Sequence, residues 1–75
     1  MTLRKFHSLN EKEKYYTLKH QGVELTCKPF EKYAVYLFQI DDFYIELKYN
    51  YENKKIDQMN AFDNLKESFL EDFQF

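Results

Sequence analysis

The stretch Tyr33–Tyr51 reads YAVYLFQIDDFYIELKYNY and decides the fold of this 75-residue chain. Both halves are rich in β-branched and aromatic residues, which suit the pleated, half-buried surface of a strand. Asp41 and Asp42 form the polar pair between the halves, and aspartate tolerates the left-handed backbone of tight turns. The stretch therefore predicts a β-hairpin, although Asp-Gly would be a stronger signal for a two-residue turn.

The side-chain pattern of this hairpin predicts its register. A two-residue turn pairs Ile40 with Phe43, and a four-residue loop would keep the same pairing. One face, here called the inner face, then carries only apolar or aromatic residues: Ala34, Tyr36, Phe38, Ile40, Phe43, Ile45, Leu47 and Tyr49. The opposite, outer face carries Tyr33, Val35, Leu37, Gln39, Tyr44, Glu46, Lys48 and Asn50. A shift by one residue would mix charged and apolar side chains on one face, so we expect the inner face to form the core.

The composition indicates one small domain, residues 1–75. A chain of this size buries about 60% of its unfolded surface, and seven Tyr and eight Phe enlarge its core. Cys27 is the single cysteine, which fits a reducing compartment, so we expect a cytoplasmic protein. The sequence has no apolar run long enough for a signal peptide or a membrane span, and we expect no membrane contact.

Capping signals predict helices before the hairpin. Thr2 is a candidate N-cap for a short turn with Leu3, Phe6 and Leu9 on one side. Asn10, with Glu13 three residues later, resembles a capping box. A helix is therefore expected over Glu11–Gln21, ending at Gly22 in a left-handed stop.

The next segment alternates like a strand. Over Val23–Lys28, we expect the side chains of Val23, Leu25 and Cys27 to point inward. A four-residue loop, Pro29–Lys32, would pair Cys27 with Ala34 and keep all three residues on the inner face.

The segment after the turn Glu52–Lys54 allows two predictions. One long helix fits the spacing of Ile56, Met59, Phe62, Leu65, Phe69 and Phe73. Alternatively, Asn64 and Glu67 form a new capping box, so Lys55–Phe62 is an edge strand and Leu65–Phe73 a final helix. We favour the second arrangement, although the alternation of the strand is poor.

These patterns predict an α+β fold with an N-terminal helix, an antiparallel meander of three or four strands, and a C-terminal helix packed on the inner face. The chain also resembles a group of short bacterial proteins of unknown function. The resemblance follows Phe6, Leu9 and Gly22, the run Leu37–Leu47, and then Ile56, Phe62 and Leu65; its most specific part is Phe43-Tyr44-Ile45-Glu46. It implies an αββββα outline and no particular activity, and the group usually has Gly where this chain has Asp42.

The usual catalytic and metal-binding patterns are missing from the sequence. One glycine cannot build a phosphate-binding loop, and His7, His20 and Cys27 lack metal-ligand spacing. Asp41 and Asp42 could contact a divalent ion but are explained by a turn. An inward-pointing Cys27 is expected to act as a small apolar residue. We therefore expect a protein that is not an enzyme and has no cofactor or metal.

The outer face is the expected partner surface, because it carries more apolar groups than a surface exposed only to water needs. Its candidate binding residues are Tyr33, Val35, Leu37, Tyr44, Glu46 and Lys48. The partner would be an unknown protein or a second copy of the chain, and a strand edge is another possible contact.

The alternative is binding of single-stranded nucleic acid on the outer face. There Tyr33 and Tyr44 would stack with bases, and Lys28 and Lys48 would contact phosphates. Glu24, Glu46 and the net charge of −2 oppose this alternative.

Overall fold

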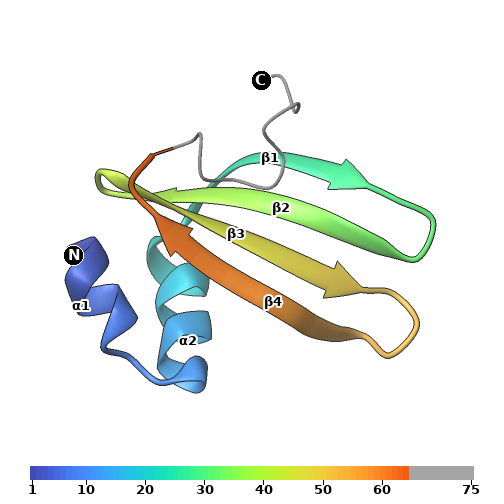
Figure 1. The fold of residues 1–75 in the computed structure, drawn as a ribbon, viewed down its shortest axis with the longest axis horizontal. Coiled ribbons are helices and arrows are strands. Elements are labelled where there is room, and N and C mark those ends of the chain that lie inside the picture. Colours follow the sequence, from blue (N-terminus) through green and yellow to red (C-terminus); the bar gives the residue numbers. More distant parts are fainter. Residues whose placement is uncertain (65–75) are drawn as a thin grey trace.

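The computed structural model describes residues 1–64, and residues 65–75 lie outside the described part. Helices α1 (Leu3–His7) and α2 (Glu11–Gln21) precede an antiparallel sheet of four strands. The strands are β1 (Val23–Pro29), β2 (Tyr33–Ile40), β3 (Phe43–Asn50) and β4 (Lys55–Phe62). Each strand lies beside its neighbour in sequence, so the sheet is a meander (Figure 1). The described part confirms the α+β fold, while the predicted C-terminal helix Leu65–Phe73 lies outside it.

The β2–β3 hairpin has the predicted register. Ile40 pairs with Phe43 across a two-residue turn, and the pairing continues to Tyr33 and Asn50. Asp41 adopts the left-handed backbone that was expected of the turn, with φ of 52°. The Gln39 side-chain amide donates a hydrogen bond to the Asp41 carbonyl at 2.9 Å, and the N-terminal ammonium pairs with the Asp41 carboxylate.

The predicted register of β1 was wrong by two residues. The Phe30 N–H donates to the Tyr33 carbonyl at 2.7 Å and closes a tighter turn than expected, so β1 runs through Pro29. Cys27 consequently pairs with Tyr36, and it is half-buried.

A bulge further along β1 changes which of its side chains lie inside. It falls between Glu24 and Thr26 and interrupts the alternation of the strand. Val23 and Leu25 are 63% and 43% exposed as a result, so their predicted inward positions were also wrong.

The segment Lys55–Phe62 is a strand, which confirms the second of the two predictions and excludes one long helix. A bulge opposite Lys48 and Tyr49 leaves Asp57 as an extra residue and explains the poor alternation of β4. The β3–β4 turn is closed by Asn50, whose Oδ1 accepts a hydrogen bond from Glu52 N at 2.8 Å.

Both N-caps were predicted correctly. Thr2 Oγ1 accepts a hydrogen bond from Lys5 N at 3.1 Å. Asn10 and Glu13 form a complete capping box, with reciprocal side-chain to backbone hydrogen bonds of 2.8 and 2.9 Å. These caps satisfy amide groups that would otherwise lack partners in the first turn of each helix.

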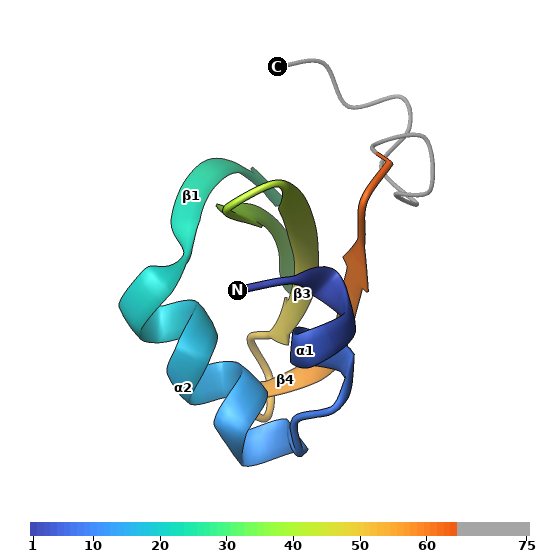
Figure 2. The same cartoon turned by 90° about the vertical axis from the view of Figure 1, so that its left-hand side faces the viewer.

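The two helices pack on the inner face of the sheet (Figure 2). The core cluster contains Phe6, Leu18, Ile40, Phe43, Ile45 and Leu47. It includes a tilted ring pair, Phe6 and Phe43, with centroids 5.7 Å apart. Figure 1 shows that the helices cover one end of this face and that the strands continue beyond them. The remaining part of the inner face is where a binding surface can form.

Gly22 ends α2 for a reason that differs from the predicted one. Its backbone is extended, with φ of −73° and ψ of 138°, so it is not a left-handed stop. A Cβ atom at this position would lie 2.5 Å from the carbonyl oxygen of Leu18 and 2.9 Å from Leu18 Cδ1. Glycine is required here because α2 turns into β1 with no space for a side chain.

Gly22→Ala is expected to destabilise the fold by about 1–3 kcal/mol, because the added methyl group overpacks the end of the helix. This cost exceeds the gain of about 0.4–1 kcal/mol that Gly→Ala gives at an unstrained position. Urea unfolding would measure it, with Gln21→Ala at the neighbouring exposed position as control. Equal midpoints for Gly22→Ala and wild type would show that the backbone shifts at no cost.

Candidate binding groove

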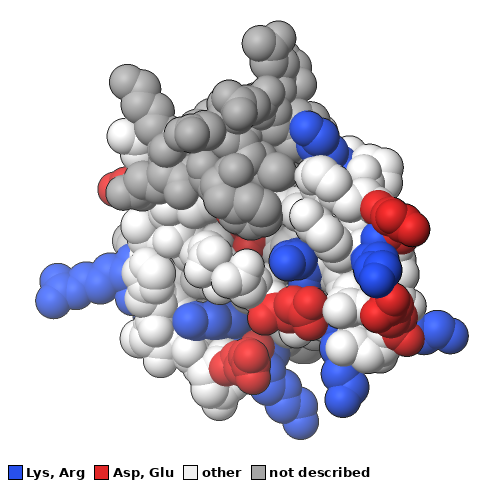
Figure 3. Space-filling model, turned by 45° about the vertical axis from the view of Figure 1, so that its right-hand side comes forward, with Lys and Arg blue, Asp and Glu red and all other residues white. Residues whose placement is uncertain are grey.

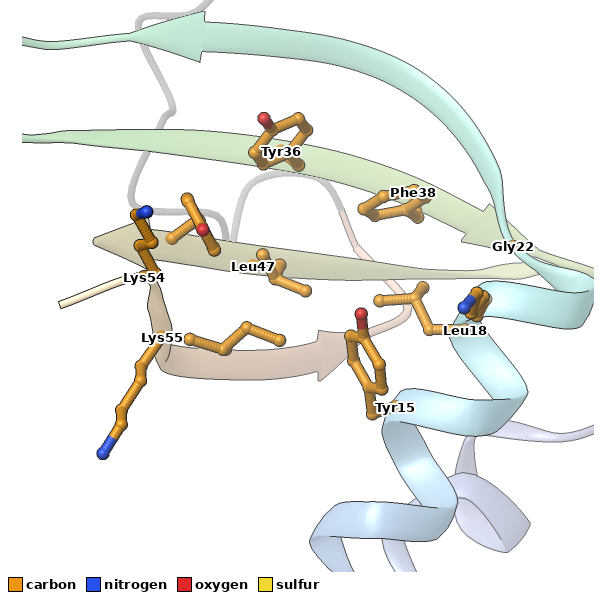
Figure 4. A pocket seen from close by; sticks show the side chains of 11 residues that line it. Tyr15, Leu18, Gly22, Tyr36, Phe38, Leu47, Lys54 and Lys55 are labelled. Atoms are coloured by element: carbon orange, nitrogen blue, oxygen red, sulfur yellow. The ribbon is translucent and has the colours of Figure 1, made fainter. Parts of the chain in front are cut away.

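An open groove lies on the inner face beside α2, where the strands extend past the helices (Figure 4). Its volume is about 620 Å³. The lining residues come from α2, from β2, β3 and β4, and from the β3–β4 turn. They are Tyr15, Leu18, Lys19, Gly22, Tyr36, Phe38, Leu47, Tyr49, Lys54, Lys55 and Ile56. The groove is thus the uncovered continuation of the hydrophobic core.

The groove has an apolar floor with polar groups placed around it. Phe38, Tyr49 and Ile56 are only half-buried, although they pack against the buried core cluster. Tyr15 stands at the α2 side with its ring near Leu18 (Figure 4). Aromatic rings of this kind offer a large apolar contact area together with a hydroxyl group for hydrogen bonding.

The charged side chains that line the groove are all positive. Lys19 lies near the end of α2, and Lys54 and Lys55 lie at the β3–β4 turn. The lining contains no Asp or Glu, and none of these lysines forms an ion pair with another residue in the range 1–64. Lys54 is fixed in the left-handed region, with φ of 57°. The groove therefore presents a positive rim around an apolar floor.

Tyr36 is the groove residue with a perturbed acid–base equilibrium. Burial of its hydroxyl, the negative charge of the nearby Cys27 thiolate and a hydrogen bond with Cys27 raise its pKa above the ordinary value of 10.0. Both residues lie on the inner face, at paired positions of β1 and β2. Tyr36 is neutral at neutral pH, as a tyrosine with its ordinary pKa would also be, so its hydroxyl can donate or accept a hydrogen bond there. The raised pKa extends this neutral state to higher pH.

The Tyr36 hydroxyl is expected to ionise above pH 10 in a tyrosinate absorbance titration, and Tyr36→Phe should remove that late step. Because the folded pKa is raised, the contribution of Tyr36 to stability is complete below about pH 10 and is lost as the pH rises through the folded pKa. Cys27→Ser removes the thiolate charge and should move the Tyr36 step to lower pH. An unchanged titration in Cys27→Ser would show that the thiol does not affect Tyr36.

The sequence-predicted partner residues lie on the outer face, but its centre is buried. Val35 and Leu37 are 0% and 1% exposed, and Glu46 is 2% exposed. Tyr33, Tyr44 and Lys48 are half-buried. No buried side-chain oxygen or nitrogen in residues 1–64 lacks a hydrogen-bond partner, as the buried carboxylate of Glu46 requires. Three of the six predicted residues are therefore not open surface in this structure.

The aromatic and basic residues of the outer face contact one another. The Tyr33 ring stacks on Phe30 with centroids 4.7 Å apart, and Lys48 Nζ lies 4.4 Å from the Tyr33 centroid. The ring centroids of Tyr44 and Phe62 are 6.2 Å apart. In Figure 3, basic and acidic side chains alternate over the visible described surface without a continuous basic patch. This arrangement gives little support to the nucleic-acid alternative.

The free edge of β1, another predicted contact, carries features that hinder strand addition. The bulge at Leu25 disrupts its row of hydrogen-bonding groups, and Pro29 has no N–H to donate. Glu24 and Lys28 add charge along the strand. The groove on the inner face is therefore the stronger candidate site.

Comparison of the chain with protein-family models finds no match, and none is found among curated proteins or solved structures. The resemblance to short bacterial proteins stays a prediction. Residues 1–64 contain no cluster of His, Cys, Asp or Glu arranged to hold a metal ion. No helix in the same part of the chain is long and apolar enough to span a membrane.

Sequence reasoning did not identify the groove, because it assigned the whole inner face to the core. A signal for it was present in the element lengths. An α2 of 11 residues spans about 16 Å, whereas strands of eight residues span about 26 Å. Helices that pack at one end cannot cover such a face, and its remaining aromatic residues line a groove.

Proposed function

We propose that this protein is a small, non-enzymatic, cytoplasmic interaction module that binds an acidic, amphipathic segment of a partner protein in the inner-face groove. The observation that supports this most is the combination of an open apolar floor with three lysines and no acidic side chain in the lining. Apolar side chains of the partner would lie on Phe38, Leu47 and Ile56. Its carboxylates would face Lys54 and Lys55.

The chemistry of the groove favours a protein segment over a small molecule. Small-molecule sites usually enclose 70–90% of the surface of the ligand, as estimated for drug-sized compounds. This groove lies open along the inner face. Amphipathic helices bind such grooves with apolar anchors at positions i, i+3, i+4 and i+7. Lysines at the rim then select acidic partners and increase their association rate.

Three synthetic peptides would test the proposal directly. They share Leu and Phe at helical spacing and carry Glu, Gln or Lys at the remaining positions. We expect the Glu peptide to bind most tightly by fluorescence anisotropy, and to shift the NMR signals of the Leu18, Leu47 and Ile56 methyl groups. Shifts confined to the outer-face residues Tyr33, Tyr44 and Lys48 would instead locate the site on the outer face.

Reversing the charge at the β3–β4 turn is expected to weaken binding of the Glu peptide about tenfold, since each exposed ion pair contributes about 0.2–1 kcal/mol. The variant is Lys54→Glu with Lys55→Glu. Lys5→Glu on α1 is the matched control, because it changes a lysine outside the groove lining. Equal losses of peptide affinity in the two variants would show that binding depends only on the net charge of the protein. Stronger binding of the Lys peptide than of the Glu peptide to the wild-type protein would contradict the proposal.

Light scattering of the free protein distinguishes a further possibility. A second copy of the chain could occupy the groove in place of another protein. If the wild-type protein forms dimers and the double variant Lys54→Glu, Lys55→Glu is monomeric, the partner is a second copy of the chain. Retention of single-stranded DNA at low salt, lost in Lys48→Ala, would instead support the nucleic-acid alternative.

A further inference from the structure

We propose that the acidic partner segment is anchored in the groove by a tryptophan side chain. Its ring lies over Leu47 against the rings of Tyr36, Phe38 and Tyr49, and its indole N–H donates a hydrogen bond to a tyrosine hydroxyl. This inference rests on the proposed function and names the side chain by which the groove recognises its partner.

Three aromatic rings are grouped around Leu47 on the groove floor. Leu47 pairs with Tyr36 across β2 and β3, Phe38 lies diagonal to it, and Tyr49 is two residues further along β3 on the same face. Side chains at such positions of a sheet are within reach of one another. Figure 4 shows Tyr36 and Phe38 side by side on β2, next to Leu47. All four residues line the groove, so a partner side chain that rests on Leu47 meets aromatic rings.

The rings of Tyr36 and Phe38 already form an aromatic row. Their planes are 23° apart and their centroids are 6.2 Å apart. This distance lies within the range of about 4.5–7 Å that is typical of interacting aromatic pairs. Both rings are half-buried, so part of each stays open to the groove. A third ring extends this row and gains more than the burial of its area, which an aliphatic anchor does not.

The polar groups of the lining favour tryptophan over phenylalanine. Tyr15, Tyr36 and Tyr49 bring hydroxyl groups to the groove, and a tyrosine hydroxyl can accept a hydrogen bond from an indole N–H. The three lysines of the lining add ammonium groups, which are attracted to the face of tryptophan more strongly than to other rings. Tryptophan therefore uses the apolar floor, the hydroxyl groups and the positive rim together.

Four acidic peptides test this anchor on the intact chain. They keep the Glu and Leu residues of the Glu peptide and differ at one central position, which is Trp, Phe, cyclohexylalanine or Leu. We expect the Trp peptide to bind about tenfold more tightly than the Leu peptide. The Phe peptide should exceed the cyclohexylalanine peptide, which fills a similar space without an aromatic ring. The protein contains no tryptophan, so the emission of the peptide is measured directly and should shift to shorter wavelength on binding.

Removing one ring from the groove should remove the preference. In Phe38→Leu, the advantage of the Trp peptide over the Leu peptide should fall from about tenfold to about threefold or less. Phe30→Leu is the matched control, because Phe30 stacks on Tyr33 outside the groove lining and should leave all affinities unchanged. Circular dichroism establishes that the variants are folded. Tyr36→Leu applies the same test to the second ring of the row if Phe38→Leu does not fold.

The outcomes separate this inference from the proposed function. Equal affinities of the four peptides would overturn the tryptophan anchor and leave the acidic-segment proposal in place. A Trp advantage that persists in Phe38→Leu and in Tyr36→Leu would do the same. Absence of binding by all four peptides would overturn both.

Discussion

Leu37→Glu is expected to unfold most of the protein. Leu37 pairs directly with Glu46 across β2 and β3, and both side chains are buried. The variant would place two carboxylates opposite each other on a dry surface, where an unpaired charge costs several kcal/mol. A domain of 75 residues has a total stability of roughly 4–11 kcal/mol, so one such change removes most of it.

Circular dichroism and urea unfolding would measure this effect, with two further variants as controls. Leu37→Met keeps the volume and should cost less than about 1.5 kcal/mol. The double variant Leu37→Glu, Glu46→Leu returns the pair to a single carboxylate and should recover part of the lost stability. A folded Leu37→Glu protein with near wild-type stability would show that the outer face opens to water easily.

This result bears on how the outer face is tested. From sequence, Leu37→Glu was the natural way to disrupt a partner surface there. Because Leu37 is buried, loss of partner binding in this variant would report unfolding and not a lost contact. Half-buried Tyr44 is better suited, and Tyr44→Ala paired with a stability measurement would address the predicted surface directly.

The elements that sequence predicted well are those set by local rules. The β2–β3 register follows from a period of two with a charged turn, since a one-residue shift would expose the apolar side chains of the inner face. The caps at Thr2 and Asn10 depend on residues three positions apart. The strand order up to Asn50 follows from the same local signals, whereas Lys55–Phe62 fitted both an edge strand and a helix because a bulge breaks its alternation.

The features that sequence missed depend on contacts between elements. The bulges in β1 and β4 each insert a residue, and periodicity alone does not locate them. The bulge after Glu24 turned Val23 and Leu25 outward against their alternation. The groove depends on where α2 packs against the sheet, which it does through Leu18 in the core cluster. Groove-lining residues such as Tyr15 and Ile56 could not be assigned before that placement was known.

Leu18→Ala is expected to detach α2 and remove the groove. Only Thr17 and Leu18 are buried in this helix, and Leu18 is its sole member of the core cluster. Truncating a buried leucine costs about 2–5 kcal/mol. Eleven residues do not form a stable helix in water without such packing, so a detached α2 should also unwind.

The effect on α2 can be separated from global unfolding by amide hydrogen exchange. We expect the α2 amides of Leu18→Ala to exchange at least tenfold faster while the β2–β3 amides stay protected, because the hairpin retains Ile40, Phe43 and Ile45 in its core. Binding of the Glu peptide should be lost in parallel, since α2 forms one wall of the groove. Tyr16→Ala is the matched control in the same helix, as Tyr16 is 64% exposed and lies outside the groove lining. Peptide binding that survives in Leu18→Ala with α2 unprotected would show that the sheet alone forms the site.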